Sequence, residues 1–356
     1  MNDRILRLRS VMRENGIDAV ILKSVTAIRY FSGFTSEDAS VVVTESRSVL
    51  LTDFRYTIQA KAQSGDCCEI LEVSGAAHNE AIKKIIADEN VGKMGFEEDY
   101  VSFAAYQIYA GFGAELVPFA KQLHHLRIVK SQDEIECLQK AQEIADAAFE
   151  ELLKTIHPGM TERRVAAELE YICAKLGSEG PSFDTIVGSG PNGAMCHAVP
   201  GDRKLQEGDL VVLDYGCLYN GYHSDMTRTF AVGKVDPFAE EIYNIVREAQ
   251  KRALDALKPG MTGKELDAIA RDYIKEKGYG ECFGHSLGHG FGLLIHEAPS
   301  ASVLGETVFE EGMTITVEPG IYIEDKFGVR IEDCCVVTKD GKLDLVRSTK
   351  DLMHIN

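Results

Sequence analysis

The stretch that decides the fold is Leu210–Phe230, LVVLDYGCLYNGYHSDMTRTF, in which an apolar run, a turn and a polar run follow one another. The dipeptide Asn220-Gly221 predicts a two-residue hairpin loop, because both residues tolerate the positive φ that a type I′ turn requires. A loop of two residues pairs Tyr219 with Tyr222. The stretch is therefore expected to form two antiparallel strands in a fixed register.

This register brings two acids together on one face of the hairpin. By the same count Gly216 pairs with Asp225, so Asp214 lies two residues from the partner of Asp225 and is its diagonal neighbour. Two carboxylates on an otherwise apolar strand pair repel each other and are costly to bury unless a cation lies between them. The hairpin itself is the first indication of a metal site.

A second hairpin repeats the arrangement. In Met313–Thr338 an apolar strand carries Glu318, the chain turns around Asp325–Gly328, and the return strand brings Glu332 to about the level of Glu318. Between the two hairpins lies Gly284–Gly292, GHSLGHGFG, where glycines allow a close approach of the backbone and present histidines. Four acids and a histidine are expected to converge.

The two hairpins belong to an internal repeat. Pro158-Gly159-Met160-Thr161 recurs 101 residues later as Pro259–Thr262, and each copy separates two amphipathic helices. Each copy continues into a histidine-containing loop and then into an acid-bearing hairpin. His197 and His296 hold corresponding places in the two copies. We therefore expect two related halves that face each other across one site.

The first part of the chain alternates between strand and helix patterns, which predicts a separate α/β domain. A capping box, Ser131 to Glu134, opens a long helix after it. We expect a domain of residues 1–127, structural or substrate-capping in role, followed by a catalytic domain of residues 128–356. The elements predicted for the first domain cover residues 3–15, 19–22, 41–44, 49–52, 54–63, 70–73, 77–88, 93–97, 103–112 and 116–118.

Composition excludes several classes of protein. Acidic residues outnumber basic ones by 56 to 38, and the net charge of −18 together with the lack of a basic cluster excludes a nucleic-acid partner. No apolar run reaches membrane-spanning length, and the N-terminus has no apolar signal core, so we expect no membrane association and a cytoplasmic protein. The nine cysteines form no metal-binding spacing and are expected to be reduced thiols.

The predicted donor set indicates two divalent ions. Asp214, Asp225, Glu318 and Glu332 with one histidine are too acidic for a single ion. Two-metal hydrolytic sites hold their ions roughly 3.5–4 Å apart with bridging carboxylates and lower the pKa of bound water from 15.7 toward about 7. A carboxylate-rich set favours Mn²⁺, although Co²⁺, Fe²⁺ or Zn²⁺ also suits it.

At these residues the chain resembles the M24 metallopeptidases, which have the pita-bread fold, and within them the aminopeptidase P and prolidase branch. The motifs are LDYGCLYNGYHSDMTRTF, GHGFGLLIHEAP, TVEPGIY and GVRIEDCCVVT, and the first domain resembles the creatinase-type domain of that branch. The resemblance implies five metal ligands and a homodimer. The implied ligands are Asp214, Asp225, His289, Glu318 and Glu332, with Asp225 and Glu332 bridging both ions.

The resemblance also implies roles in catalysis. Glu318 takes a proton from the bridging water, and His197 and His296 contact the scissile carbonyl and the intermediate that forms from it. From the residues themselves, His285 is expected to support the site, to contact substrate or to take part in catalysis. Arg330, two residues from Glu332, is expected to orient a carboxylate or bind substrate. Two further expectations are an exposed His223 and a supporting hydrogen bond from Thr227 or Thr229.

The expected reaction is hydrolysis of the bond between an N-terminal residue and a proline in second position, by a metal-bridged hydroxide. Dipeptidases of this branch carry an arginine four residues after the equivalent of His296, where this chain has Ser300. This difference favours an Xaa-Pro aminopeptidase acting on longer peptides, with an Xaa-Pro dipeptidase, or prolidase, as the alternative. A methionine aminopeptidase would lack the first domain, and a non-catalytic module or a metal-free creatinase-type hydrolase would have lost ligands.

Overall fold

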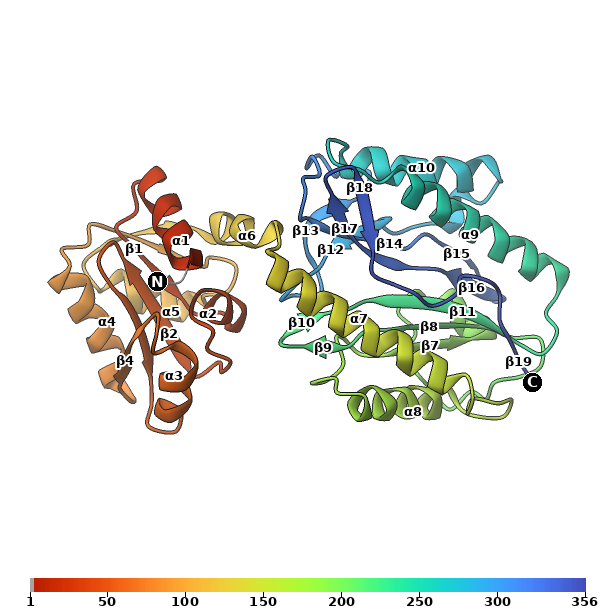
Figure 1. Ribbon diagram of the computed structural model, residues 1–356, viewed down its shortest axis with the longest axis horizontal. Coiled ribbons are helices and arrows are strands. Elements are labelled where there is room, and N and C mark those ends of the chain that lie inside the picture. Colours follow the sequence, from red (N-terminus) through yellow and green to blue (C-terminus); the bar gives the residue numbers. More distant parts are fainter. Residues whose placement is uncertain (1–2) are drawn as a thin grey trace. The chain divides into compact units, whose positions relative to one another are not determined.

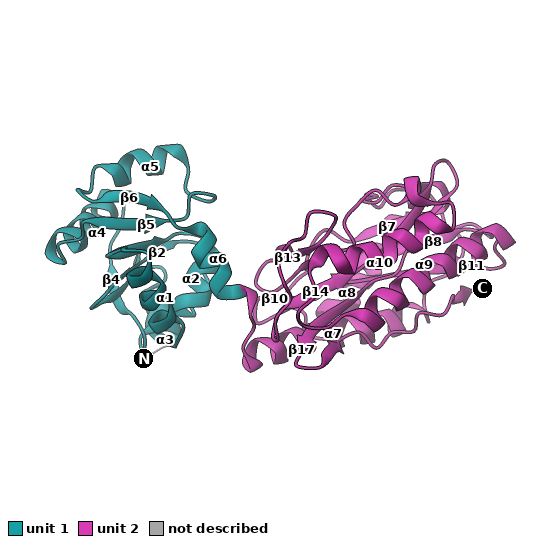
Figure 2. Ribbon diagram, turned by 90° about the horizontal axis from the view of Figure 1, so that it is seen from above, with its two compact units in different colours: residues 1–127 teal, residues 128–356 magenta. Residues whose placement is uncertain are grey.

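The computed structural model describes residues 3–356 of the chain. These residues form two compact units that meet at the peptide bond between Arg127 and Ile128, and each unit is considered by itself below (Figures 1 and 2). No helix among residues 3–356 combines the length and the apolar composition needed to cross a membrane.

The first unit is built on a six-stranded sheet in the order β4-β3-β2-β1-β5-β6. Its strands are β1 (Ala19–Leu22), β2 (Ala39–Thr44), β3 (Ser48–Thr52), β4 (Glu69–Glu72), β5 (Lys93–Phe96) and β6 (Glu115–Pro118). Its helices are α1 (Asp3–Glu14), α2 (Val25–Ser32), α3 (Thr57–Ser64), α4 (Ala76–Asp88), α5 (Phe103–Ala110) and α6 (Ala120–Ile128). Every residue of β1, β2 and β3 is buried, because both faces of the sheet are covered.

The predicted elements of this unit are confirmed, with ends that differ by up to three residues. Helices α2 and α6 were not predicted. Helix α2 has only eight residues, and it is defined by the N-cap Ser24, whose side chain accepts a hydrogen bond from Ala27 N, and by Gly33 in the left-handed conformation. Its buried face, which includes Ile28 and Phe31, is too short to give a helical period in the sequence.

The second unit has the predicted internal repeat. Helices α7 (Gln132–Leu152) and α8 (Glu162–Lys175) pack together in the first half, and α9 (Pro237–Ala256) and α10 (Gly263–Glu276) do so in the second. The strands are β7 (Ile186–Ser189), β8 (Leu210–Tyr215), β9 (Leu218–Tyr219), β10 (Tyr222–His223), β11 (Met226–Val232), β12 (Gly288–Gly290), β13 (Glu297–Ala301), β14 (Thr314–Val317), β15 (Gly320–Ile323), β16 (Phe327–Arg330), β17 (Asp333–Thr338), β18 (Gly341–Asp344) and β19 (His354–Ile355). Two short 3₁₀ helices are η1 (Gly190–Ala194) and η2 (Gly280–Cys282).

The equivalence of the two halves extends to single hydrogen bonds. Thr161 and Thr262 are the N-caps of α8 and α10, and each caps its helix with its side chain. The capping box predicted at the start of α7 is present, and α10 begins with another, formed by Thr262 and Glu265. The related helix pairs therefore place their loops and strands in related positions, as expected of the pita-bread fold.

Both hairpins have the predicted register. Tyr219 pairs with Tyr222 around a loop in which Asn220 and Gly221 have positive φ. The longer pair β8–β11 continues the same register, which places Gly216 opposite Asp225. In the second hairpin the pairs of β15–β16 and of β14–β17 flank Glu318 and Glu332 in one register, and these two acids lie opposite each other. The acid-bearing parts of both hairpins line the same cavity.

Candidate metal centre and active site

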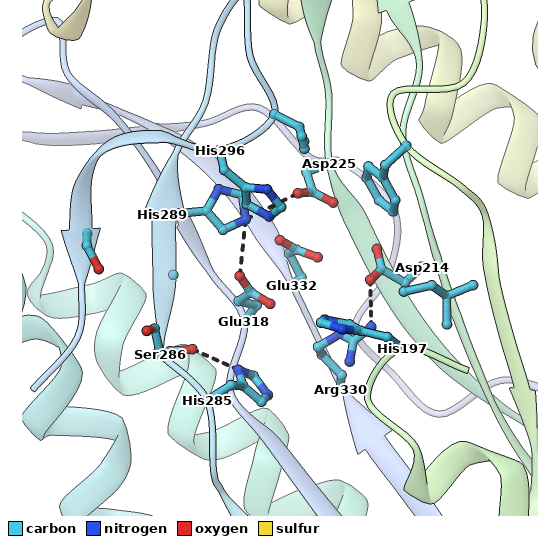
Figure 3. Close-up of a pocket in the computed structure, with 15 residues that line it drawn as sticks. His197, Asp214, Asp225, His285, Ser286, His289, His296, Glu318, Arg330 and Glu332 are labelled. Atoms are coloured by element: carbon cyan, nitrogen blue, oxygen red, sulfur yellow. Dashed lines mark hydrogen bonds and ion pairs between the residues drawn. The ribbon is translucent and has the colours of Figure 1, made fainter. Parts of the chain in front are cut away.

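The predicted site residues line one cavity of the second unit (Figure 3). The cavity has a volume of about 380 Å³, and its polar wall comes from both hairpins and from the loops before them. Three apolar residues, Phe183, Ile186 and Ile295, form another part of the wall. The predicted site residues in the lining are His197, Asp214, Asp225, His285, His289, His296, Glu318, Arg330 and Glu332.

The centre of the cavity is a cluster of carboxylates around one imidazole. His289 Nε2 lies 3.6 Å from Asp225 Oδ2 and 3.4 Å from Glu318 Oε1. One donor atom each of Asp225, His289 and Glu332 lie within 4.8 Å of one another, and Asp225 and Glu332 are buried. Side chains from the first hairpin, from β12 and from the second hairpin are thus brought to one point with donor atoms that suit a divalent cation.

Burial makes this cluster unfavourable for negative charge. It raises the pKa of Asp225 and of Glu332 well above their ordinary values, and the repulsion among the neighbouring acids raises both pKa values further. Burial also raises the pKa of Glu318 to about 8, and it lowers the pKa of His289 to about 4 with a further contribution from His296. The cluster therefore resists accumulating charge unless a cation is bound.

Two buried oxygens of the cavity's acidic residues have no hydrogen-bond donor among residues 3–356. They are Asp214 Oδ1 and Glu332 Oε1. The second oxygen of each acid is held, because Arg330 Nη2 donates to Asp214 Oδ2 (2.5 Å) and Thr227 Oγ1 donates to Glu332 Oε2 (2.7 Å). A buried acceptor without a donor is costly, and a metal ion removes this cost. The donor set therefore fits divalent cations.

We expect the metal-dependent part of the stability to grow with pH. An acid whose pKa is raised in the folded state favours folding below its ordinary pKa, and this contribution is lost as the pH rises through the folded-state pKa. For Glu318 this contribution is lost between pH 4.5, its ordinary pKa, and about pH 8, its pKa in the folded state. Melting temperatures of metal-free and Mn²⁺-loaded protein at pH 5, 6.5 and 8 should diverge progressively. An equal difference at all three values would contradict this electrostatic account.

A chain of polar contacts leads from Asp214 to His285. Besides Asp214, Arg330 donates to the Tyr322 hydroxyl (2.7 Å) and to the carbonyl of Cys196 (3.1 Å). The Tyr322 hydroxyl is hydrogen-bonded to His285 Nε2 (2.9 Å), and burial lowers the pKa of His285 to about 4. Arg330 thus contacts a carboxylate, which was one of its two expected roles. The carboxylate is that of Asp214 in the first hairpin, whereas Arg330 belongs to the second.

The other histidines differ in their surroundings. The rings of His296 and His289 pack edge to face with their centroids 4.4 Å apart, so His296 lies directly beside the carboxylate cluster. His197 is exposed and lies on the same cavity wall as Asp214 (Figure 3). The prediction that His223 is exposed was wrong. Its ring is partly buried and its Nδ1 is hydrogen-bonded to Ser182 Oγ (2.8 Å), a partner 41 residues away that no local pattern indicates.

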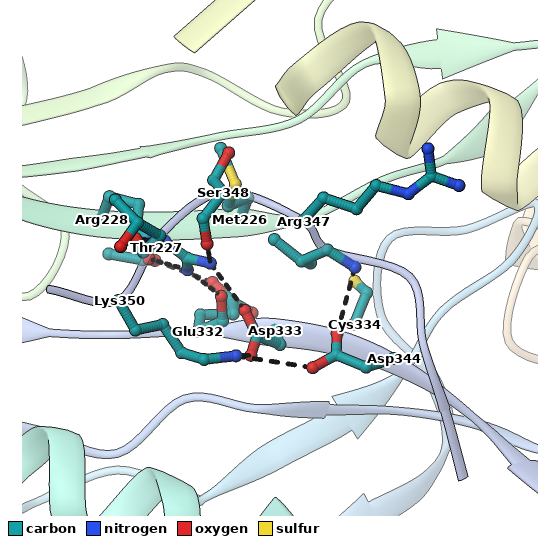
Figure 4. Close-up of polar contacts among 12 residues, drawn as sticks. Met226, Thr227, Arg228, Glu332, Asp333, Cys334, Asp344, Arg347, Ser348 and Lys350 are labelled. Atoms are coloured by element: carbon teal, nitrogen blue, oxygen red, sulfur yellow. Dashed lines mark hydrogen bonds and ion pairs between the residues drawn. The ribbon is translucent and has the colours of Figure 1, made fainter. Parts of the chain in front are cut away.

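A buried ionic network that the sequence did not reveal lies behind Glu332 (Figure 4). The fully buried Arg228 donates to the carbonyl of Glu332 (2.6 Å) and to Asp333 Oδ1 (2.8 Å). It also donates to the carbonyls of Ser348 and Thr349 in the C-terminal segment. Arg228 therefore supports the strand that carries Glu332 from the side away from the cavity.

Taken together, the two hairpins and their donor cluster define a metal-dependent hydrolase with the pita-bread fold. The model of metallopeptidase family M24 matches residues 136–339, and that of the creatinase/prolidase N-terminal domain matches residues 4–129. The chain belongs to metallopeptidase family M24, whose members hydrolyse peptide bonds.

Relatives with named activities match nearly the whole chain. The Xaa-Pro dipeptidase of Pyrococcus furiosus is 42% identical over 99% of this chain and 100% of its own. The solved structure of an Xaa-Pro dipeptidase from Bacillus anthracis superimposes with a TM-score of 0.96, at 44% identity and 99% coverage of both chains. An X-Pro aminopeptidase from Thermotoga maritima has a TM-score of 0.91, at 40% identity and 96% and 98% coverage. These names favour dipeptide hydrolysis, the alternative in the sequence analysis, over its first interpretation.

Proposed function

We propose that this chain is an Xaa-Pro dipeptidase that uses two divalent ions. The observation that carries the proposal is the convergence of five ligand side chains in one cavity that is lined by further histidines. Relatives named as dipeptidases support the dipeptide substrate. Asp214, Asp225, His289, Glu318 and Glu332 would hold the two ions.

The residues of the cavity suit hydrolysis of a peptide bond. When bound, a pair of divalent ions lowers the pKa of water and supplies a nucleophile at neutral pH. Glu318, whose carboxylate lies 3.4 Å from His289 Nε2, would accept a proton from a water molecule in the cavity. His296 and His197 donate hydrogen bonds to the carbonyl oxygen as negative charge develops on it. The apolar wall of Phe183, Ile186 and Ile295 excludes water and suits a proline ring.

Three finer properties are part of the proposal. Mn²⁺ is the proposed ion, because four of the five ligands are carboxylates. A homodimer is proposed from the family resemblance, and its test is the mass of the protein in solution. A cytoplasmic location is supported by the nine cysteines, all of which are free.

Ser300 supports the second candidate, an Xaa-Pro aminopeptidase acting on longer peptides. It lines the cavity, and it holds the position at which dipeptidases of the aminopeptidase P and prolidase branch carry an arginine for the terminal carboxylate of the substrate. The Mn²⁺-loaded enzyme should nevertheless hydrolyse Ala-Pro at least about tenfold faster than Ala-Pro-Ala in kcat/KM, a difference of about 1.4 kcal/mol that one charge-assisted contact supplies. A preference for Ala-Pro-Ala would instead support the aminopeptidase.

The variant Ser300→Arg tests how the carboxylate is bound. A guanidinium at this position is expected to raise kcat/KM for Ala-Pro by about tenfold. The kcat/KM for Ala-Pro-amide should stay unchanged, because this substrate has no terminal carboxylate. Ser300→Ala is the control for the loss of the hydroxyl. An equal gain with Ala-Pro-amide would refute the carboxylate interpretation, and rapid cleavage of a Met-Ala peptide by the wild type would indicate a methionine aminopeptidase.

A further inference from the structure

The loop that presents His197 has little regular structure to hold it. It runs from the end of β7 at Ser189 through the single turn of η1 to Gly201. Met195 and Val199, which flank His197, are 54% and 85% exposed, so near His197 the loop is held mainly by the buried Ala198 and by the hydrogen bond from Arg330 to the carbonyl of Cys196. A histidine that must meet a carbonyl oxygen at hydrogen-bond distance needs another support.

Glu162 supplies that support from the first residue of α8. Its side chain is fully buried, and both of its oxygens accept hydrogen bonds from the loop. Oε1 accepts from Ser189 N (2.8 Å), from Ser189 Oγ (2.6 Å) and from Asn192 Nδ2 (3.0 Å). Oε2 accepts from Asn192 Nδ2 (3.1 Å) and from Gly201 N (3.1 Å). One carboxylate therefore joins the beginning and the end of the loop.

The internal repeat indicates that the fold does not require this carboxylate. The position equivalent to Glu162 in the second half is Gly263. A Cβ atom there would lie 1.9 Å from the carbonyl oxygen of Ser300, so the backbone of the following segment fills the space. The helix still contacts its loop, because Lys264 N donates to Gly305 O as Arg163 N donates to Gly201 O. The side chain of Glu162 is an addition specific to the His197 loop.

We propose that Glu162 is a positioning residue that acts on catalysis through His197. This inference rests on the proposed function, in which His197 donates to the substrate carbonyl. Glu162 is absent from the cavity lining, and its hydrogen bonds hold Ser189 and Asn192 before His197 and Gly201 after it. An ionised carboxylate suits this task because it accepts at both oxygens, whereas an amide would turn its NH₂ group toward the N–H donors of the loop.

The test is the pair of variants Glu162→Gln and His197→Ala with their double variant, assayed on Ala-Pro with Mn²⁺. We expect Glu162→Gln to lower kcat by about 10- to 100-fold, the range for partners that orient catalytic ligands, with KM and metal content unchanged. The double variant should be no slower than His197→Ala alone, because both changes disable the same group. The inference would be overturned if the losses of kcat in the two single variants multiplied in the double variant, or if Glu162→Gln had a normal kcat.

Two further variants separate positioning from loss of folding. Asn192→Ala removes one donor to Glu162 at a partly exposed site, and it should lower kcat in the wild type but not in the His197→Ala background. Glu134→Gln changes another buried glutamate at the start of a helix, one that accepts from Ser131 N, and it should lower the melting temperature while kcat is kept. If His197→Ala has a normal kcat, the proposed role of His197 and this inference both fail. If only Glu162→Gln has a normal kcat, this inference alone fails.

Discussion

The variant Asp225→Asn is expected to lose activity and metal while its metal-free form becomes more stable than the metal-free wild type. Asp225 is a buried acid of the cluster, and burial and then repulsion by Glu332, Asp214 and Glu318 raise its pKa well above the ordinary value. An amide of the same size removes that repulsion. It also removes an anionic ligand, and since loss of an outer-shell partner alone costs about 10- to 100-fold, activity should fall by at least about 100-fold.

Three measurements test this prediction: the metal content after dialysis, kcat on Ala-Pro, and the melting temperature of the metal-free form at pH 8. His296→Ala is the contrast, because it should keep the metal and lose turnover if the ring acts on the carbonyl oxygen and is not a ligand. Full activity in Asp225→Asn would show that the metal site is misplaced. A metal-free variant that melts below the metal-free wild type would show that Asp225 is held by contacts other than repelling carboxylates.

Buried carboxylates destabilise the fold unless a cation is bound, and this cost explains why the site could be predicted from the sequence. A carboxylate on an apolar strand needs a partner, and the two-residue period of a strand fixes which acids share a face. The Asn220-Gly221 turn sets the register of the first hairpin, and the turn at Asp325, which has positive φ, sets the second. Local rules were therefore sufficient to place Asp214 beside Asp225 and Glu318 opposite Glu332, and the internal repeat indicated that the two pairs face one site.

The same rules do not reveal what supports the ligands. Arg330 was expected near Glu332 because the two residues share a face of one strand, yet its guanidinium contacts Asp214 on the other hairpin. Arg228 looks like an ordinary polar residue of a strand, and four of its five hydrogen-bond partners lie 104 to 121 residues further along the chain. Such contacts depend on how separate hairpins and the C-terminal segment pack, which no local period or turn determines.

Arg228→Met is expected to cause the largest loss of stability among the changes considered. All of its donors are used, and its side chain is fully buried beside Asp333. Burial alone would raise the pKa of Asp333, but Arg228 and Lys350 hold that pKa below its ordinary value. Breaking a buried ion pair on one side typically costs about 3–5 kcal/mol, because the remaining charge loses its partner. Lys350 stays beside Asp333, so the carbonyls of Glu332 and Ser348 are expected to contribute much of the loss.

Urea unfolding of metal-free protein, followed by a signal from the second unit, measures this loss. The matched control is Arg247→Met, because Arg247 pairs with Asp351 of the same C-terminal segment at the surface, where an ion pair contributes less than about 1 kcal/mol. Arg228→Met should also weaken Mn²⁺ binding, since the strand that carries Glu332 loses its anchor, whereas Arg247→Met should not. A loss in Arg228→Met as small as in the control would mean that Asp333, Gln250 and Lys350 hold this strand without the guanidinium.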